Sequence, residues 1–262
     1  MKISIVTVSY NQAHFLGEAL DSVLGQAYPE LEYIVVDPGS KDGSRELIDV
    51  RAGQLAQRVY EPDRGAADGL NKGFARATGE IFGFLNADDV LYPGSLQAVA
   101  EHFRRHPECD IVFGDGATID KDGKRLRHFH ASNFTVERYC YGGAVWLQQS
   151  TFFRARAYHQ SPGFNEANRT CWDGELFVSM VRQGARVGYL PKTLAGFRIH
   201  PESISGSGRL AELYRGDCRR IFRELRGREW NRADSVRSFV YRATSYALRK
   251  VQAVGRALEE SQ

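Results

Sequence analysis

Residues 81–89 read Ile-Phe-Gly-Phe-Leu-Asn-Ala-Asp-Asp, an apolar run that ends on an amide and two carboxylates. A run this apolar predicts a buried strand, and in an open α/β sheet ligands bind beyond the carboxyl ends of the strands. At ~4 Å and an effective dielectric of ~20, the two adjacent carboxylates would repel each other by about 4 kcal/mol. A divalent cation relieves that repulsion, and oxygen ligands suit Mg²⁺ or Mn²⁺. Alternatively, Asp88 or Asp89 caps the helix expected near Ser95, and the two acidic residues alone do not decide between these interpretations.

The first 115 residues around this stretch alternate short strands with helices. The strand candidates are residues 3–8, 33–37, 58–60, 81–85 and 111–113. Between them, apolar residues recur at helical spacing in residues 15–24, 47–48, 67–77 and 96–103. This β-α-β-α order predicts an α/β fold built around a mostly parallel sheet.

The second half has a different pattern. Asp122-Gly123 predicts a hairpin turn between residues 117–119 and 126–129. Residues 151–153, 187–190 and 194–199 are further strand candidates, and residues 176–181 predict a helix. The serine- and glycine-rich residues 203–208 predict a flexible loop. Beyond the loop the chain is helical, with one apolar stripe formed by Val236, Phe239, Val240, Ala243, Tyr246, Ala247, Val251 and Val254.

Charge divides the 262 residues unevenly. Residues 209–262 carry 13 Lys+Arg and 7 Asp+Glu, a net charge of +6, so the total of +3 leaves −3 for residues 1–208. We therefore expect a main domain over 1–208 and a basic helical C-terminal extension over 209–262. The extension either forms an in-plane membrane helix that binds anionic lipid, or packs on the main domain with a solvated basic face.

Composition and missing motifs narrow the function. With 42% apolar and 26% charged residues, the chain is typical of a soluble globular protein. Its four cysteines have no zinc-finger spacing, and neither a secretory signal nor an apolar run of membrane-spanning length is found, which together predict a cytoplasmic protein with free thiols. No G-x-G-x-x-G follows the first strand and no P-loop motif occurs, so nicotinamide enzymes and P-loop enzymes are not expected. No nucleic-acid-binding module is recognisable either, so no nucleic acid partner is expected.

Residues 3 to about 205 resemble an inverting family 2 glycosyltransferase with a GT-A fold. Five stretches carry the resemblance in the right order: 4–11, 33–37 with the following Gly-Ser turn, 61–73, 77–80 and 84–89. The resemblance implies a Rossmann-like mixed, mostly parallel sheet flanked by helices. It also implies a nucleotide-sugar half over 1–115 and an acceptor half over 116–208.

The resemblance assigns the donor side to one group of residues. Those expected to bind the nucleotide-sugar are Thr7, Ser9, Tyr10, Asp37, Asp63, Lys72, Asn86, Asp88 and Asp89. Asp88 is the expected ligand of Mn²⁺ or Mg²⁺, and His200 is a second candidate ligand. Asn86 stands where the stricter family motif has an Asp, and Pro38 where many members have an acidic residue or glycine; neither change removes Asp88.

The acceptor side follows from Trp172-Asp173-Gly174-Glu175, which resembles the acidic motif that carries the family's catalytic base. Asp173 falls at the position of the base, and Glu175 is the second choice. Gln149 and Trp172 are expected to face the acceptor. Without the resemblance, an Asp at a helix N-terminus is explained by its favourable interaction with the helix dipole.

The implied reaction transfers a sugar from a UDP- or dTDP-sugar to a hydroxyl of a glycan or lipid-linked acceptor in polysaccharide or cell-surface glycan synthesis. The lipid-linked acceptor would bring the enzyme to the inner face of the membrane. The alternative function is a non-catalytic, sugar-nucleotide-binding scaffold protein of a glycan assembly complex.

Overall fold

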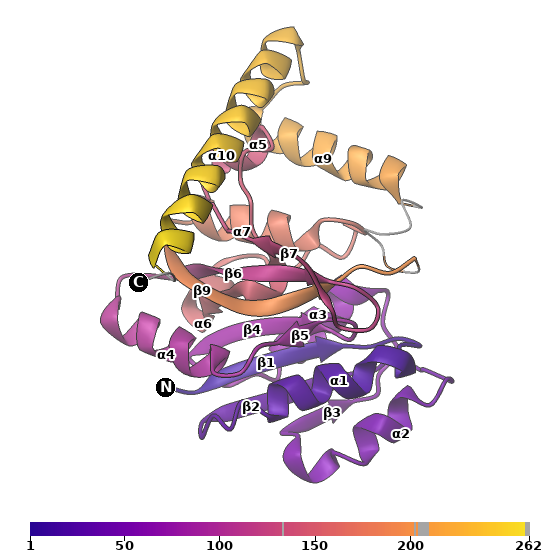
Figure 1. The fold of residues 1–262 in the computed structure, drawn as a ribbon. Coiled ribbons are helices and arrows are strands. Elements are labelled where there is room, and N and C mark those ends of the chain that lie inside the picture. The colour runs from indigo at the N-terminus through magenta and orange to yellow at the C-terminus, as the bar shows by residue number, and fades with distance from the viewer. Residues whose placement is uncertain (133, 202, 204–209, 260–262) are drawn as a thin grey trace.

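The computed structural model describes residues 1–132, 134–201, 203 and 210–259, and it confirms the predicted α/β fold (Figure 1). The strands are β1 (Ile3–Val8), β2 (Leu31–Val36), β3 (Gln57–Val59), β4 (Ile81–Asn86), β5 (Val90–Leu91), β6 (Ile111–Ile119), β7 (Arg125–Phe129), β8 (Thr151–Arg154) and β9 (Val187–Arg198). The helices are α1 (Ala13–Leu24), α2 (Ser44–Asp49), α3 (Ala66–Phe74), α4 (Ser95–Arg105), α5 (Val136–Cys140), α6 (Ala155–Gln160), α7 (Trp172–Arg182), α9 (Ala211–Arg226) and α10 (Arg232–Glu259).

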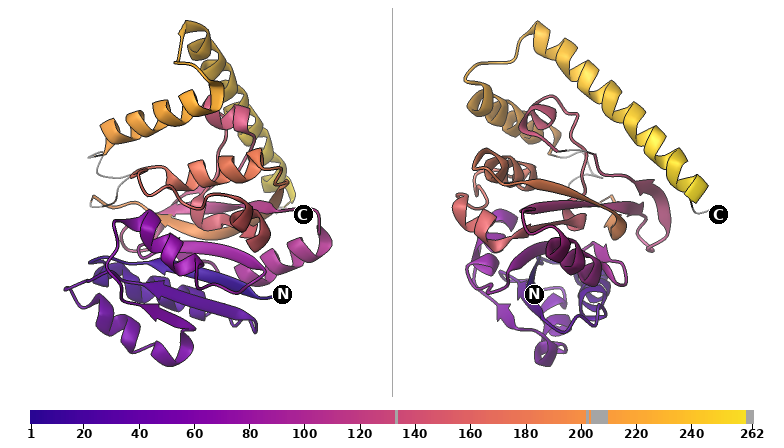
Figure 2. Two further views of the ribbon diagram at one scale, coloured as in Figure 1. Left: turned by 180° about the vertical axis from the view of Figure 1, so that it is seen from behind. Right: turned by 90° about the vertical axis from the view of Figure 1, so that its left-hand side faces the viewer.

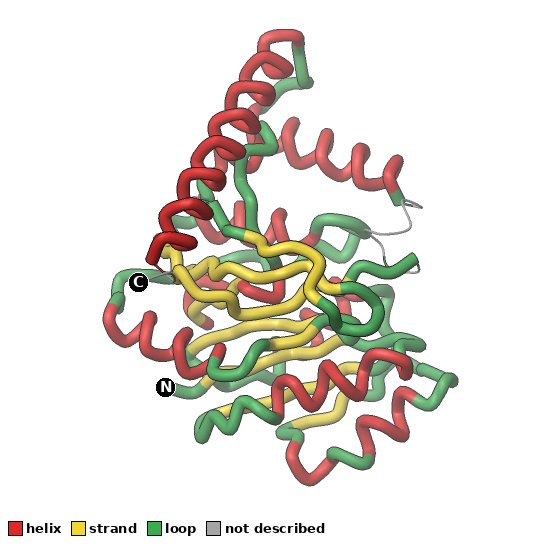
Figure 3. The backbone as a smooth tube through the Cα atoms, in the orientation of Figure 1, coloured by secondary structure: helices red, strands yellow, loops and turns green. Residues whose placement is uncertain are grey.

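All the described strands belong to one mixed sheet, which runs through the middle of the molecule with helices on both sides (Figure 3). Its order is β3-β2-β1-β4-β8-β6-β9-β5, with β7 paired to β6. Strands β1 to β4 pair only in parallel with one another, whereas β8 joins β4 to β6 through two antiparallel pairings. The carboxyl ends of β1, β2 and β4 therefore meet at one edge of the sheet, where polar residues were predicted.

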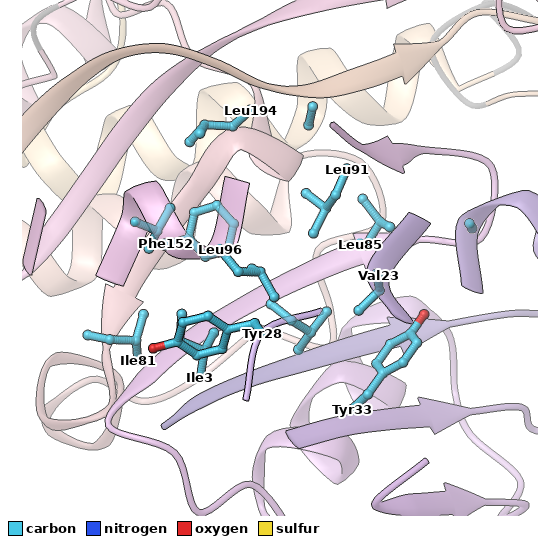
Figure 4. Packing of buried hydrophobic residues seen from close by; sticks show 14 of the residues in the cluster. Ile3, Val23, Tyr28, Tyr33, Ile81, Leu85, Leu91, Leu96, Phe152 and Leu194 are labelled. Atoms are coloured by element: carbon cyan, nitrogen blue, oxygen red, sulfur yellow. The ribbon is translucent and has the colours of Figure 1, made fainter. Parts of the chain in front are cut away.

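Two hydrophobic cores lie on the two faces of the sheet, because successive side chains of a strand point to opposite sides. In β1, Ile3 and Ile5 join the core under α1, α2 and α4, and Val6 joins the core under α3, α6 and α7. Figure 4 shows the first core, with Leu85 of β4 and Leu91 of β5 packed near Val23 of α1. Both cores hold the strands rigidly, so the loops at the strand ends have fixed starting points.

In two places, two consecutive predicted strands form one continuous strand in the structure. Residues 111–113 and 117–119 form the continuous β6, and residues 187–190 and 194–199 form β9 with an irregular register near Asp115. The Gly-Asp-Gly at 114–116 suggested a break, but these glycines serve close packing. A Cβ at Gly116 would lie 2.5 Å from Leu147 Cδ1 and 2.8 Å from the Ala195 carbonyl oxygen.

We expect Gly116→Ala to lower the free energy of unfolding by about 1–3 kcal/mol, because overpacking against the Ala195 backbone forces β6 and β9 apart. The midpoint of urea denaturation measures this. Gly53→Ala is the matched control, since a Cβ at Gly53 meets nothing within 4 Å. Equal midpoints for the two variants would show that β6 tolerates a side chain there.

Three short elements were not predicted: β5, α5 and α6. Each has too few residues to show a periodic pattern, and β5 exists because Val90 and Leu91 pair with Gly196 and Ala195 of β9. This pairing curls the sheet and brings the end of β9 beside the residues that follow β4.

Helices α9 and α10 form the predicted helical extension and stand beyond the sheet, away from β1 to β3 (Figure 1). Of the predicted loop 203–208, Ser203 is described and residues 204–208 lie outside the described part. The side chains of Val251 and Val254 likewise lie outside it. In the part of the chain that the structure describes, no helix combines the length and apolar character needed to cross a membrane.

Candidate active site

A cavity of about 740 Å³ opens at the edge of the sheet where β1 and β4 end, and it reaches the first turn of α7. Eight predicted site residues line it: Ser9, Tyr10, Asp63, Asn86, Asp88, Gln149, Trp172 and Asp173. Residues more than 160 positions apart in the sequence thus share one cavity. Its wall joins the predicted donor side to the predicted acceptor side.

Polar residues gather where β1 and β2 end, beside the cavity. Tyr10 lines the cavity and is 61% exposed, whereas Ser9 is buried. Among the described residues, Ser9 Oγ and Asp37 Oδ2 are buried without a hydrogen-bond partner. A buried polar atom left unpaired costs about 1–3 kcal/mol, so these two atoms favour a ligand that supplies the missing hydrogen bonds.

Asp37 follows β2 and is held in place from one side only. Its Oδ1 accepts hydrogen bonds from the amides of Gly39 and Ser40, at 3.0 and 2.8 Å, and from Arg45 Nε at 3.1 Å. Asp37 does not itself line the cavity, but its neighbour Pro38 does. Asp63 lines the cavity, and burial raises the pKa of its carboxyl group.

Asp88 forms the polar edge at the end of β4. Its Oδ2 lies 3.1 Å from His200 Nε2, and the His200 ring packs 4.7 Å from the Phe15 ring. Neither Asp88 nor Asp89 caps a helix, because β5 intervenes and α4 begins after Gly94. The helix-cap interpretation of these carboxylates is therefore wrong. A carboxylate oxygen and an imidazole nitrogen at a cavity edge fit a divalent cation such as Mn²⁺.

Asp89, the next residue, stabilises this edge of the cavity. It is buried, and burial raises the pKa of its carboxyl group well above the ordinary value, with the nearby Asp88 charge acting in the same direction. Asp89 Oδ1 accepts a hydrogen bond from the Arg198 amide at 2.9 Å. Asp89 therefore joins the end of β4 to the end of β9.

The buried guanidinium of Arg198 completes the support. It donates to the carbonyl oxygens of Asp88, Asp120 and Lys121 at 2.8, 3.1 and 3.0 Å. It also pairs with Glu18 of α1 at 2.6 Å and lies over the Phe15 ring. One side chain thus fixes the backbone of Asp88 against α1 and the β6–β7 turn.

Asp173 is the second residue of α7 and lines the same cavity. Burial raises the pKa of its carboxyl group, which makes the carboxylate a stronger base. The Trp146 indole donates a hydrogen bond to Asp173 Oδ2 at 3.1 Å. This carboxylate is therefore buried, oriented by a neighbour and still in contact with the cavity.

Six predicted site residues lie outside the cavity lining: Asp37, Asp89 and His200, whose contacts are described above, and Thr7, Lys72 and Glu175. Thr7 hydrogen-bonds Tyr33 Oη at 2.8 Å in the core, and Lys72 Nζ bonds the Pro62 carbonyl and Asp68 at 2.5 and 3.1 Å. Glu175 is held by Arg220 at 2.7 Å. Although burial acts to raise the pKa of Glu175, the hydrogen bonds from Arg220 and two asparagines lower it overall.

Trp146 and Gln148 also line the cavity, and Trp146 was not among the predicted site residues. Gln148 Nε2 donates to the Phe84 carbonyl at 2.6 Å, and Asn86 Nδ2 donates to Gln148 Oε1 at 3.2 Å. The signal for Trp146 was its type, since a buried indole N–H usually has a partner. Nothing in the sequence, however, indicated that this partner is Asp173.

A second set of possible metal ligands lies away from the cavity lining. The ligand atoms of Asp115, His128 and His130 lie within 4.8 Å of one another. Hydrogen bonds already occupy this set, because Asp115 accepts from Tyr189 Oη at 2.8 Å and lies 3.0 Å from His130 Nδ1. These contacts account for the buried carboxylate by fixing the end of β7 to β6 and β9.

Comparison with known proteins now assigns the family. The sequence pattern described as Glycosyl transferase family 2 matches residues 4–166. The chain belongs to glycosyl transferase family 2.

An uncharacterized glycosyltransferase from Nostoc sp. (strain PCC 7120) is 38% identical to this family 2 chain over 214 residues, and the match covers 76% of the chain and 65% of the Nostoc protein. An uncharacterized glycosyltransferase from Rickettsia conorii is 29% identical, and the match covers 78% of the family 2 chain but 35% of that protein. The family 2 chain thus spans less than two thirds of either relative.

Solved structures confirm the GT-A fold that the resemblance implied. S. aureus TarS 1–349 in complex with UDP-GlcNAc superimposes with a TM-score of 0.70 at 17% identity, over 94% of this family 2 chain and 72% of TarS. The mannosyltransferase PcManGT from Pyrobaculum calidifontis, in complex with GDP-Man and Mn²⁺, gives a TM-score of 0.62 at 20% identity, over 98% of this chain and 80% of that one. At these identities the superpositions establish the shared fold.

Proposed function

We propose that this chain is an inverting glycosyltransferase that moves a sugar from a UDP- or dTDP-sugar to a hydroxyl of a glycan or lipid-linked acceptor. The main observation that supports this proposal is that Asp88, at the end of β4, and Asp173, at the start of α7, line one cavity. Asp88 would bind a cation that contacts the donor's diphosphate, and Asp173 would take the proton from the acceptor hydroxyl.

In this proposal residues 1–115 bind the donor. The unpaired atoms of Ser9 and Asp37 would accept hydrogen bonds from the base or ribose, and the exposed ring of Tyr10 would flank the base. UDP-GlcNAc in TarS and GDP-Man in PcManGT bind to the same fold, which supports a nucleotide-sugar in this cavity.

Asp88 and His200 would hold Mn²⁺ or Mg²⁺, since their facing atoms lie 3.1 Å apart at the cavity edge. When bound, such a cation neutralises the charge that develops on the departing diphosphate. Asp89 and Arg198 keep the Asp88 backbone in position.

Residues 116–208 would receive the acceptor beside Gln149 and Trp172. Asp173 takes the proton from the acceptor hydroxyl as that oxygen attacks the donor's anomeric carbon. The bond from that carbon to the nucleoside diphosphate breaks on the opposite side, so the configuration inverts. A positioned general base of this kind contributes about 10²–10⁴-fold to the rate.

The proposed setting is the cytoplasm in polysaccharide or cell-surface glycan synthesis, with a lipid-linked acceptor at the inner face of the membrane. The four cysteines are free, which is usual in a reducing compartment.

A panel of sugar nucleotides tests the proposal, with released nucleoside diphosphate as the signal and Mn²⁺ or Mg²⁺ supplied. We expect one UDP- or dTDP-sugar to release its diphosphate, and NMR of the product to show the inverted anomer. Release of pyrophosphate would instead indicate a nucleotidyltransferase. Nucleotide binding without any turnover, with acceptors present, would indicate a scaffold protein.

The hydrogen bond from Trp146 predicts a pH effect. It lowers the pKa of Asp173 against the upward effect of burial, so Trp146→Phe should raise that pKa further. Because the base acts only when deprotonated, the acid limb of kcat/KM against pH should move to higher pH. Trp230→Phe, far from the cavity lining, is the control. An unmoved acid limb in Trp146→Phe would show that this indole does not tune the base.

A further inference from the structure

Helix α10 is attached to the rest of the protein through its polar side. Ser245 is buried, where it accepts a hydrogen bond from Arg138 at 2.5 Å and donates to the Gly143 carbonyl at 2.6 Å. Tyr241 stacks on Tyr141 with ring centroids 5.6 Å apart. A Cβ at Gly143 would lie 2.9 Å from Tyr241 Cβ, so the backbones approach closely. The inner side of α10 is therefore fixed.

The opposite side of α10 is apolar and exposed. Val236 precedes Ser245 by nine residues, which at about 3.6 residues per turn places it on the other side of the helix. Val236 is 65% exposed and Phe239 is 74% exposed. The outer face, as we name it, spans an arc of about 120° and consists of Val236, Phe239, Val240, Ala243, Tyr246 and Ala247, all of them exposed. Helix α10 thus packs on the main domain, as one of the two expectations had it, but it does so through residues such as Ser245 and Tyr241, and its apolar stripe stays exposed.

No other described element covers the outer face. Figure 2 shows α10 along the outside of the molecule, with the sheet and the other helices on its inner side. Single exposed apolar residues are normal on a protein surface, but a contiguous apolar face on one helix marks an interaction site. Something outside the described chain is expected to cover it.

The charged residues around the outer face indicate what kind of partner it binds. Arg232, Arg242 and Lys250 are exposed and border the outer face. The one acidic residue between positions 232 and 250 is Asp234, which is buried and paired with Arg228 at 2.8 Å. Two copies joined through this face would bring basic borders together without an opposing carboxylate from α10. An anionic lipid surface would accept both the apolar side chains and the basic border.

We propose that the outer face of α10 lies in the interface of an anionic lipid bilayer and holds the protein to the membrane surface. Phe239 and the two valines would enter the boundary between headgroups and acyl chains, and the basic border would contact lipid phosphates. The inference is independent of the catalytic proposal, because it uses no cavity residue and is tested without activity.

The test is co-sedimentation of the full chain with vesicles made of equal parts phosphatidylcholine and phosphatidylglycerol, and with vesicles of phosphatidylcholine alone. We expect binding to the anionic vesicles that weakens as salt is added, and much weaker binding to the neutral ones. The double variant Val236→Ser with Phe239→Ser should bind anionic vesicles at least about tenfold more weakly, since it removes two large apolar side chains from the face. Arg232→Gln with Arg242→Gln should lose about fivefold per residue.

The matched control is Val50→Ser with Leu126→Ser, which replaces two apolar residues that are equally exposed but lie on α2's C-cap and β7. It should bind as the unchanged chain does. Circular dichroism verifies that the exposed substitutions leave the fold intact. Equal vesicle binding by the outer-face and control variants would overturn the proposal. The proposal would also be overturned if light scattering showed a dimer of the unchanged chain and a monomer of the outer-face variant. The outer face would then bind a second copy.

Discussion

Asp173→Asn is expected to lower kcat by about 10²–10⁴-fold while leaving the affinity for the nucleotide-sugar unchanged. The amide keeps the size of the carboxylate but cannot take the acceptor's proton. Asp173 lies at the start of α7, whereas Asp88, the proposed cation ligand, lies after β4, so donor binding through the cation does not require the Asp173 charge. Single-turnover rates and calorimetric titration with UDP or dTDP measure the two quantities.

Glu175→Gln is the matched control for this variant. Glu175 lies two residues further along α7, outside the cavity lining, and its pKa is lowered by Arg220 against the effect of burial. The substitution should lower the free energy of unfolding by about 1–3 kcal/mol, because the hydrogen bonds with Arg220 weaken. It should not affect proton transfer from the acceptor. If Glu175→Gln lost turnover and Asp173→Asn did not, the base would be Glu175.

Asp88→Asn is expected to lower kcat/KM by roughly 10³-fold, the equivalent of about 4 kcal/mol of charge stabilisation on the diphosphate. Unlike Asp173→Asn, it should also weaken donor binding, because the cation and the diphosphate share this edge of the cavity. Titration of the donor with Mn²⁺ and with EDTA measures the effect: the unchanged chain should gain affinity from Mn²⁺, and the variant should gain little.

The control for Asp88→Asn is Asp122→Asn, the same chemical change at an exposed carboxylate paired with Lys121 in the β6–β7 turn. It should keep the full gain in affinity from Mn²⁺. A gain of the same size in Asp88→Asn would contradict the assignment of the cation to the end of β4.

The fold of residues 1–110 could be predicted from the sequence because its strands and helices are separate apolar patterns with polar ends. Residues 81–89 predicted both the buried strand β4 and the polar edge after it. The part from β6 onward was harder, since β6 and β9 contain glycine, proline and a buried Asp115 that resemble breaks. Their continuity comes from pairing with each other, which is a contact between distant segments.

The candidate site divides in the same way. Ser9, Tyr10, Asn86 and Asp88 could be placed because each lies at the end of a strand or within two residues after it. Asp173 could be placed only through the family resemblance, and its contact with Trp146 depends on how the segment before β8 folds over α7. The role of Glu175 as an anchor for Arg220 could not be foreseen, because that partner lies on α9, outside the resembling region.

The single guanidinium of Arg198 has a consequence for how the protein matures. Arg198 is 110 residues downstream of Asp88, whose carbonyl it binds, and it ends β9. A nascent chain that ends before β9 therefore lacks the side chain that ties the end of β4 to α1 and to the β6–β7 turn. The backbone around Asp88 can be fixed in this way only after residues up to Arg198 have been synthesised.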